Sequence, residues 1–241
     1  MSIPIVIEER ADVAFLEHLE DWMSRLEPLS LEAYVREAGG GEHVGIFCVD
    51  VIVGFCTEGP LQSDRIRAIV NPIRDLMLRA WELGVRAFVL PQDNHPPSSP
   101  EFSDYPPHCI VGTSECQTVP ELMSLPFSDR FVIIPKKSIS SAVRTDLPDW
   151  VDRHPEITHR IVLGDCTDLC TYQLAIYLKT EATARDVACS VLVPADCVDT
   201  YDIPVAAATE AGIPPHPGDL FHSLFLYHMA LNGIRVVRAL V

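Results

Sequence analysis

Apolar positions along the chain change their spacing near residue 44, and the change predicts two kinds of structure. In residues 1–42 they recur at helical spacing before a run of glycines at 39–41, with Leu16, Leu19, Trp22, Met23 and Leu26 as the repeating positions. Residues 44–49 are continuously apolar, which is typical of a strand buried on both faces of a parallel sheet. We therefore expect a mostly helical N-terminal extension over 1–42 and an α/β domain over 43–241.

Strands and helices alternate through the rest of the chain. Further buried strands are expected at 85–90, 131–134, 160–163, 188–193 and 234–240, and helices at 64–83, 167–184 and 220–231. This alternation predicts a three-layer, doubly wound α/β fold, with a mainly parallel sheet covered by helices on both faces. Ligands of such folds bind beyond the carboxyl ends of the strands.

Chemically unusual residues follow four of the expected strands. Asp50 follows the first strand, Asp93 and His95 the second, Lys137 the third and Cys170 the fourth. Because the carboxyl ends of parallel strands meet at one rim of the sheet, these side chains are expected to converge there. This convergence is the main indication of a functional site.

The proline-rich loop after the second strand offers a set of metal ligands. Two imidazoles and two carboxylates fall within residues 93–108, namely Asp93, His95, Glu101 and His108. Nitrogen and oxygen ligands of this kind suit Zn²⁺, Fe²⁺ or Mn²⁺ and leave positions open for water or substrate. The alternative is a polar surface loop with incidental histidines, and spacing alone does not decide between the two.

A candidate nucleophile lies in the first turn of the helix expected at 167–184. Backbone N–H groups at a helix start lower the pKa of a thiol such as Cys170 and can hold an oxyanion. Cys166 competes with it on position, and a packed core cysteine is the alternative. Asp50 could accept the thiol proton or merely cap a loop. Lys137 could orient that carboxylate, or be a solvated lysine beside Lys136.

Charge and composition narrow the classes of partner. The net charge of −16 disfavours nucleic acid and anionic membranes, whereas a small neutral or cationic substrate suits it. The first residues lack the pattern of a secretory signal, and the chain has no apolar stretch of about 20 residues that could cross a bilayer. We therefore expect a cytoplasmic protein whose eight cysteines are thiols. A dinucleotide site is set aside, because no G-x-G-x-x-G run follows the first strand.

The motifs described above resemble those of the isochorismatase-like cysteine hydrolases. Residues 50–55 resemble the D-x-x-x-x-F opening of that superfamily, and residues 164–170 resemble its G-x-x-T-D-x-C nucleophile motif. Residues 135–142 are similar to its lysine segment, in which the spacing to a Ser-Ala pair favours Lys137. The resemblance runs from about residue 44 to the C-terminus.

The loop narrows the resemblance to the nicotinamidases, also called pyrazinamidases. Asp93, His95 and Glu101, followed by the Y-P-P-H-C-x-x-G-T run at 105–113, resemble the metal site of that group. The resemblance implies a divalent metal, with zinc expected first and iron or manganese as alternatives. It also implies a homo-oligomer that acts on a small amide.

The resemblance also implies a role for each matching residue. Cys170 would attack the carboxamide carbon, Asp50 would take the thiol proton, and Lys137 would hold the carboxylate. The N–H groups of Cys166 and Cys170 would form the oxyanion hole, beside a cis peptide that maps to 165–166. Phe55 and Tyr105 would sandwich the substrate ring. The metal would be held by Asp93, His95, Glu101 and His108 and would bind the ring nitrogen.

The implied reaction converts nicotinamide to nicotinate and ammonia through a cysteine thioester, in pyridine nucleotide salvage. Two alternatives stay open at this point. The same residues could hydrolyse another small amide or an N-carbamoyl compound. A metal-binding homologue could also keep the fold without turnover, although the presence of the acid, the lysine and the cysteine argues against it.

Overall fold

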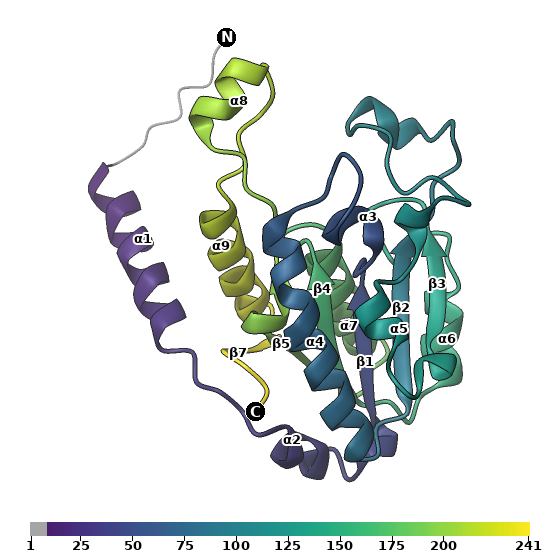
Figure 1. The fold of residues 1–241 in the computed structure, drawn as a ribbon. Helices are drawn as coiled ribbons and strands as arrows, with labels where there is room; N and C mark the ends of the chain where they lie inside the picture. Colours follow the sequence, from purple (N-terminus) through teal and green to yellow (C-terminus); the bar gives the residue numbers. More distant parts are fainter. Residues whose placement is uncertain (1–8) are drawn as a thin grey trace.

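The computed structural model describes residues 9–241. Within them, seven parallel strands form one sheet in the order β3-β2-β1-β4-β5-β7, and the short β6 pairs with β4 (Figure 1). The strands are β1 Val44–Val49, β2 Ala87–Asp93, β3 Val132–Lys136, β4 His159–Asp165, β5 Ser190–Pro194, β6 Val198–Asp199 and β7 Arg235–Val237.

Helices cover both faces of this sheet. They are α1 Glu9–Ser24, α2 Leu31–Glu37, α3 Val53–Cys56, α4 Asp64–Glu82, α5 Pro120–Met123, α6 Leu147–Arg153, α7 Cys170–Ala184, α8 Val205–Ala211 and α9 Gly218–Leu231. One apolar cluster joins the sheet to α2, α4 and α5, and a second joins it to α6, α7 and α9. The predicted three-layer, doubly wound α/β fold is therefore confirmed.

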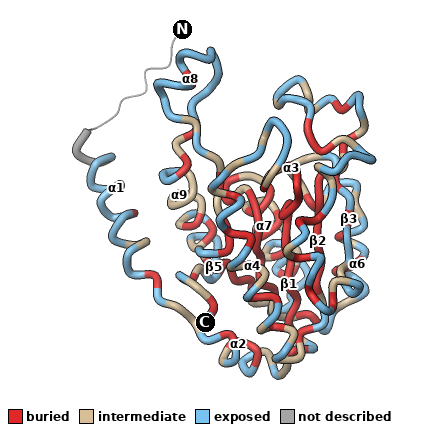
Figure 2. Tube along the Cα trace, in the orientation of Figure 1, coloured by how far each residue is buried: buried red, intermediate tan, exposed pale blue. Residues whose placement is uncertain are grey.

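Strand β1 shows why the apolar run at 44–49 is continuous. Side chains alternate between the two faces of a strand, so Ile46 and Cys48 enter one apolar cluster while Phe47 and Val49 enter the other. All six residues of the strand are buried. Buried positions gather in the strands and on the inner sides of the helices (Figure 2). A strand covered on both sides has no polar alternation, as the sequence predicted.

Several element boundaries differ from the expected ones. Strand β2 runs three residues beyond its expected end, so Asp93 is the last residue of the strand. Helix α7 begins at Cys170, because a tight turn occupies residues 166–169. The cysteine is consequently the first residue of its helix. Helix α6 and strand β6 were missed, since seven and two residues are too few to show a periodic pattern.

Before β1, the described residues form α1, α2 and a short 3₁₀ turn at 41–43, joined by a non-helical stretch at 25–30. Helix α1 lies along α9, and the rings of Phe15, His18 and Trp22 meet that of Tyr227 edge to face, with centroids 5.8, 5.7 and 5.2 Å away (Figure 1). The division of the chain at residue 42 stays a prediction. No helix within residues 9–241 is long and apolar enough to cross a membrane.

Candidate active site

The sheet order places the chemically unusual residues side by side. Lys136, Asp93 and Asp165 are the last residues of β3, β2 and β4, and Asp50 directly follows β1. In the order β3-β2-β1-β4 these four ends are neighbours, and α7 starts with Cys170 just beyond them. The predicted convergence of Asp50, Asp93 and Cys170 at one rim is therefore what the structure shows.

A glycine lets β4 approach β1 closely at this rim. Gly164 has φ +112°, and a Cβ at this position would lie 1.9 Å from the carbonyl oxygen of Val49. No side chain fits there. The next peptide bond, between Asp165 and Cys166, is cis, as the family resemblance implied.

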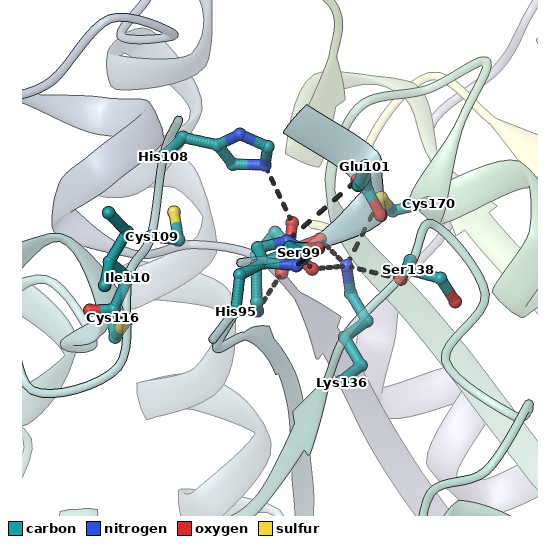
Figure 3. Close-up of polar contacts among 12 residues, drawn as sticks. His95, Ser99, Glu101, His108, Cys109, Ile110, Cys116, Lys136, Ser138 and Cys170 are labelled. Carbon is teal, nitrogen blue, oxygen red and sulfur yellow. Dashed lines mark hydrogen bonds and ion pairs between the residues drawn. The ribbon is translucent and has the colours of Figure 1, made fainter. Parts of the chain in front are cut away.

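The lysine at this rim is Lys136, not the predicted Lys137. Its ammonium nitrogen lies 2.7 Å from Asp50 Oδ2, 2.6 Å from Asp93 Oδ1 and 3.5 Å from the sulfur of Cys170 (Figure 3). Its side chain is completely buried, whereas Lys137 is exposed. The reason is the alternation of side chains along β3, which puts residue 136 on the same inward face as the buried Ile134. This two-residue period was a usable signal in the sequence.

One buried ammonium thus lies between two buried carboxylates. Burial alone would lower the pKa of Lys136, but the charges of Asp50 and Asp93 outweigh burial and raise it. Burial is the largest single influence on Asp93 and opposes its ionisation, yet the combined attraction of Lys136 and His95 outweighs it and lowers the pKa of this carboxyl. Burial and the negative charge of Asp93 raise the pKa of Asp50 to about 7, against the opposing effect of Lys136. Asp50 can therefore exchange a proton near neutral pH, which a general base requires.

The thiol of Cys170 is held in its protonated form. Burial raises its pKa well above the ordinary value, and the nearby Lys136 offsets only part of this effect. The expected lowering of the thiol pKa by the helix start is thus wrong, because burial is the larger influence here. The ammonium of Lys136 joins this thiol to Asp50, at 3.5 Å from the sulfur and 2.7 Å from Asp50 Oδ2. The sulfur becomes a nucleophile only when a base removes its proton, and Asp50 is the candidate base on the other side of the same ammonium.

Two backbone N–H groups beside the sulfur are candidates for an oxyanion hole. Within residues 9–241, the N–H groups of Cys166 and Cys170 donate to no loop or cap acceptor. The N–H groups of Leu169 and Thr171 both donate to the carbonyl of Cys166, at 3.1 Å each, and so shape the turn between the two cysteines. Free N–H groups at such a turn can stabilise a developing oxyanion.

Three of the four predicted metal ligands form a compact group. One ligand atom each from Asp93, His95 and His108 lies within 4.8 Å of the other two. The Nδ1 of His108 is 2.8 Å from the carbonyl oxygen of Pro106, which leaves Nε2 facing Asp93 Oδ2 at 3.9 Å. The Nε2 of His95 lies 3.4 Å from Asp93 Oδ1.

This group fits a divalent metal. The Nε2 atom of His95 is buried and has no hydrogen-bond partner among the described residues, a costly state that a metal bond would relieve. The hydrogen bond of His108 at its other ring nitrogen is the arrangement that orients metal-binding imidazoles. Glu101 Oε1 lies 3.9 Å from His95 Nε2, so this predicted ligand is beside the group. Asp93, His95 and His108 are therefore a candidate metal site, with Asp93 also paired to Lys136.

Aromatic side chains surround the candidate metal site. The rings of the predicted Phe55 and Tyr105 lie 5.8 and 6.3 Å from the ring of His108, between centroids. Phe102, which the sequence analysis missed, lies 5.6 Å from His108 and 5.7 Å from His95. No pattern marked Phe102, since a single aromatic residue in an irregular loop carries no periodicity.

The geometry defines a class of protein: a doubly wound α/β fold with a cysteine, an aspartate and a lysine at the carboxyl edge of its sheet. The isochorismatase domain model matches residues 44–212, and the chain belongs to this family. Nicotinamidase 1 of Arabidopsis thaliana is 33% identical to it over 219 residues, covering 80% of this chain and 85% of the relative.

Solved structures share this fold at lower identity. The nicotinamidase from Bacillus subtilis superposes with a TM-score of 0.62 at 22% identity, covering 81% of this chain and 99% of that one. The N-carbamoylsarcosine amidase from Thermoplasma acidophilum gives 0.58 at 18% identity, covering 80% and 95%. At these identities the likeness concerns the fold alone.

Proposed function

We propose that the protein hydrolyses nicotinamide to nicotinate and ammonia through a thioester on Cys170. The observation that carries this proposal is the buried contact of Asp50, Lys136 and Cys170 next to the candidate metal site. The name of the Arabidopsis relative, nicotinamidase 1, supports the choice of substrate.

The reaction would begin with proton transfer from the thiol of Cys170 to Asp50. The sulfur then attacks the carboxamide carbon, and the N–H groups of Cys166 and Cys170 stabilise the resulting oxyanion. Asp50 returns the proton to the leaving nitrogen, and the C–N bond breaks to give ammonia and a nicotinoyl thioester. In the second half, Asp50 takes a proton from water, which attacks the thioester carbon. Cleavage of the C–S bond releases nicotinate, and the thiol is restored.

Lys136 would keep Asp50 in place and ionised during these steps. Its ammonium contacts both the carboxylate of Asp50 and the sulfur of Cys170. It therefore stabilises the negative charge on the carboxylate before proton transfer and on the sulfur after it. Phe55 and Tyr105 would bind the faces of the pyridine ring.

A divalent metal, which we propose to be zinc, would be held by Asp93, His95 and His108, with Glu101 beside them. When bound, it supplies a Lewis acid that takes the electron pair of the ring nitrogen. Zinc as the metal, pyridine nucleotide salvage, the cytoplasmic location and the homo-oligomeric state stay predictions of the sequence.

Purified protein loaded with zinc, iron or manganese should release ammonia from nicotinamide. Replacing His95 with alanine should strip the metal and lower kcat/KM by about 100-fold or more, since one of three ligands is lost. Elemental analysis measures the metal independently of activity. His228→Ala, an exposed histidine on α9, is the matched control and should keep both metal and rate. Ammonia release from N-carbamoyl compounds but not from nicotinamide would contradict the proposed substrate.

The rate should depend on the ionisation of Asp50. Below pH 7 this carboxyl, whose pKa is raised to about 7 by burial, becomes protonated and cannot accept the thiol proton. We expect kcat/KM to fall by about tenfold per pH unit on acidification and to level off above neutrality. A profile from pH 5 to 9 measures this, and the apparent value belongs to the coupled Asp50–Cys170 pair. A rate that rises on acidification would contradict the role of Asp50.

A further inference from the structure

The tight turn at residues 166–169, just before Cys170, is called the nucleophile turn. Two histidines from the C-terminal part of the chain bind the middle of this turn. His216 Nε2 lies 2.8 Å from Asp168 Oδ2, and His222 Nδ1 lies 2.9 Å from Thr167 Oγ1. Thr167 and Asp168 lie between Cys166 and Cys170, whereas both histidines lie beyond residue 212, where the match to the family model ends. The contacts therefore join the nucleophile motif to a segment outside the matched region.

The ring of His216 is held on every side. It stacks between Tyr201 and Phe221, with centroids 3.8 and 4.4 Å away and interplanar angles of 17° and 19°. Its Nδ1 lies 2.9 Å from the carbonyl oxygen of Tyr201, and its backbone exchanges hydrogen bonds of 2.8 and 2.9 Å with Ile203. Both ring nitrogens therefore have a hydrogen-bond partner. The imidazole is therefore a fixed point rather than a mobile side chain.

The position of the nucleophile turn depends on the ring of His216. Asp168 is 7% exposed, and its Oδ1 has no hydrogen-bond partner within residues 9–241, so His216 is its anchor. Thr167 is completely buried and its N–H donates to the carbonyl of Asp199 at 2.9 Å. A shift of Asp168 would tilt the backbone that carries the N–H groups on either side of it.

We propose that His216 and His222 are positioning residues for the nucleophile turn. They hold Asp168 and Thr167 so that the N–H groups of Cys166 and Cys170 point to the place where the oxyanion forms. The proposal rests on the proposed function, because the oxyanion is that of an attacked amide. Neither histidine touches the substrate in this account, and each acts through the residue it binds.

His216→Phe tests the proposal, because it keeps a ring in the aromatic stack and removes both hydrogen bonds. We expect kcat for nicotinamide to fall by about 10- to 100-fold with KM within about twofold, the pattern of lost transition-state stabilisation. The affinity for pyridine-3-carbaldehyde, whose adduct with a thiol carries an oxyanion, should fall by a similar factor. The affinity for nicotinate should not change. A purely structural role would instead reduce the amount of folded protein and leave kcat per active site intact.

His228→Phe is the matched control, because His228 is another histidine of the C-terminal part of the chain and joins α9 to α7 through a 3.0 Å contact with the hydroxyl of Tyr172. It should leave all these quantities unchanged. If His216→Phe does not fold, Asp168→Asn removes the carboxylate at constant volume and should give the same fall in kcat. An unchanged kcat together with an unchanged aldehyde affinity in the folded variant would overturn the proposal.

Protection of Cys170 from iodoacetamide by pyridine-3-carbaldehyde, followed by mass spectrometry, separates this proposal from the proposed function. If the wild type does not turn over nicotinamide but His216→Phe weakens protection, the substrate assignment fails and the positioning role stands. If the wild type turns over nicotinamide and protection is equal in both proteins, the positioning role fails alone. Absence of protection in the wild type would also overturn it, since the turn would then hold no oxyanion.

Discussion

Replacing Cys170 with alanine is expected to abolish nicotinamide hydrolysis, with kcat falling by about 10⁴-fold or more, as when other covalent nucleophiles are removed. The sulfur forms the bond on which both halves of the reaction depend. The substitution shortens one buried side chain without removing a charge, so the fold and the bound metal should persist. Steady-state assays with elemental analysis of the same sample measure both.

Cys189→Ala is the matched control for this variant. Cys189 is a half-buried free thiol before β5, and its loss should not affect the rate. Cys166→Ala addresses the other candidate nucleophile. If the Cys170 variant kept its activity while the Cys166 variant lost it, the nucleophile would have to move to Cys166.

Replacing Lys136 with methionine is expected to be nearly as damaging. The ammonium compensates two buried carboxylates, and its removal leaves Asp50 and Asp93 facing each other without a cation. Breaking a buried ion pair in this way costs about 3–5 kcal/mol of unfolding free energy. The pKa of Asp50 should rise further, so the base stays protonated at neutral pH and kcat should fall by about 10³-fold or more.

The same substitution at the neighbouring residue provides the control. Lys137 is exposed, so Lys137→Met should change neither the unfolding free energy in denaturant titrations nor the rate. A comparison of the two variants distinguishes the position suggested by the motif from the one found in the structure. Loss of activity in the Lys137 variant with retention in the Lys136 variant would reverse the assignment.

The parts of the fold that could be predicted are those with long, regular patterns. β1 is six apolar residues in a row, and α4 carries its apolar face through nineteen residues, so both were found with boundaries correct to within a residue. The end of β2 was missed because Pro91, Gln92 and Asp93 interrupt the apolar run, although their backbone still pairs with β3. Pairing between strands is a tertiary contact that local composition does not record.

The site was predictable where topology alone determines position. Asp50, Asp93 and Cys170 lie at or just beyond the ends of parallel strands, and parallel strands bring their ends together. The choice between Lys136 and Lys137 required the side-chain period of β3, which motif spacing concealed. The pKa of Cys170 depends on burial, and the partners of Asp168 and Thr167 lie about fifty residues further along the chain. Neither the pKa of Cys170 nor the partners of Asp168 and Thr167 can be obtained from local sequence.

The central claim is that Cys170 carries the acyl group of the substrate between the two halves of the reaction. Rapid acid quenching of the enzyme during nicotinamide turnover, followed by proteolysis and mass spectrometry, tests it most directly. We predict a nicotinoyl adduct on the peptide that contains Cys170, which disappears as the substrate is exhausted and is absent in Cys170→Ala. Turnover with the adduct on another residue would contradict this claim. So would turnover in which no adduct is found at any quench time.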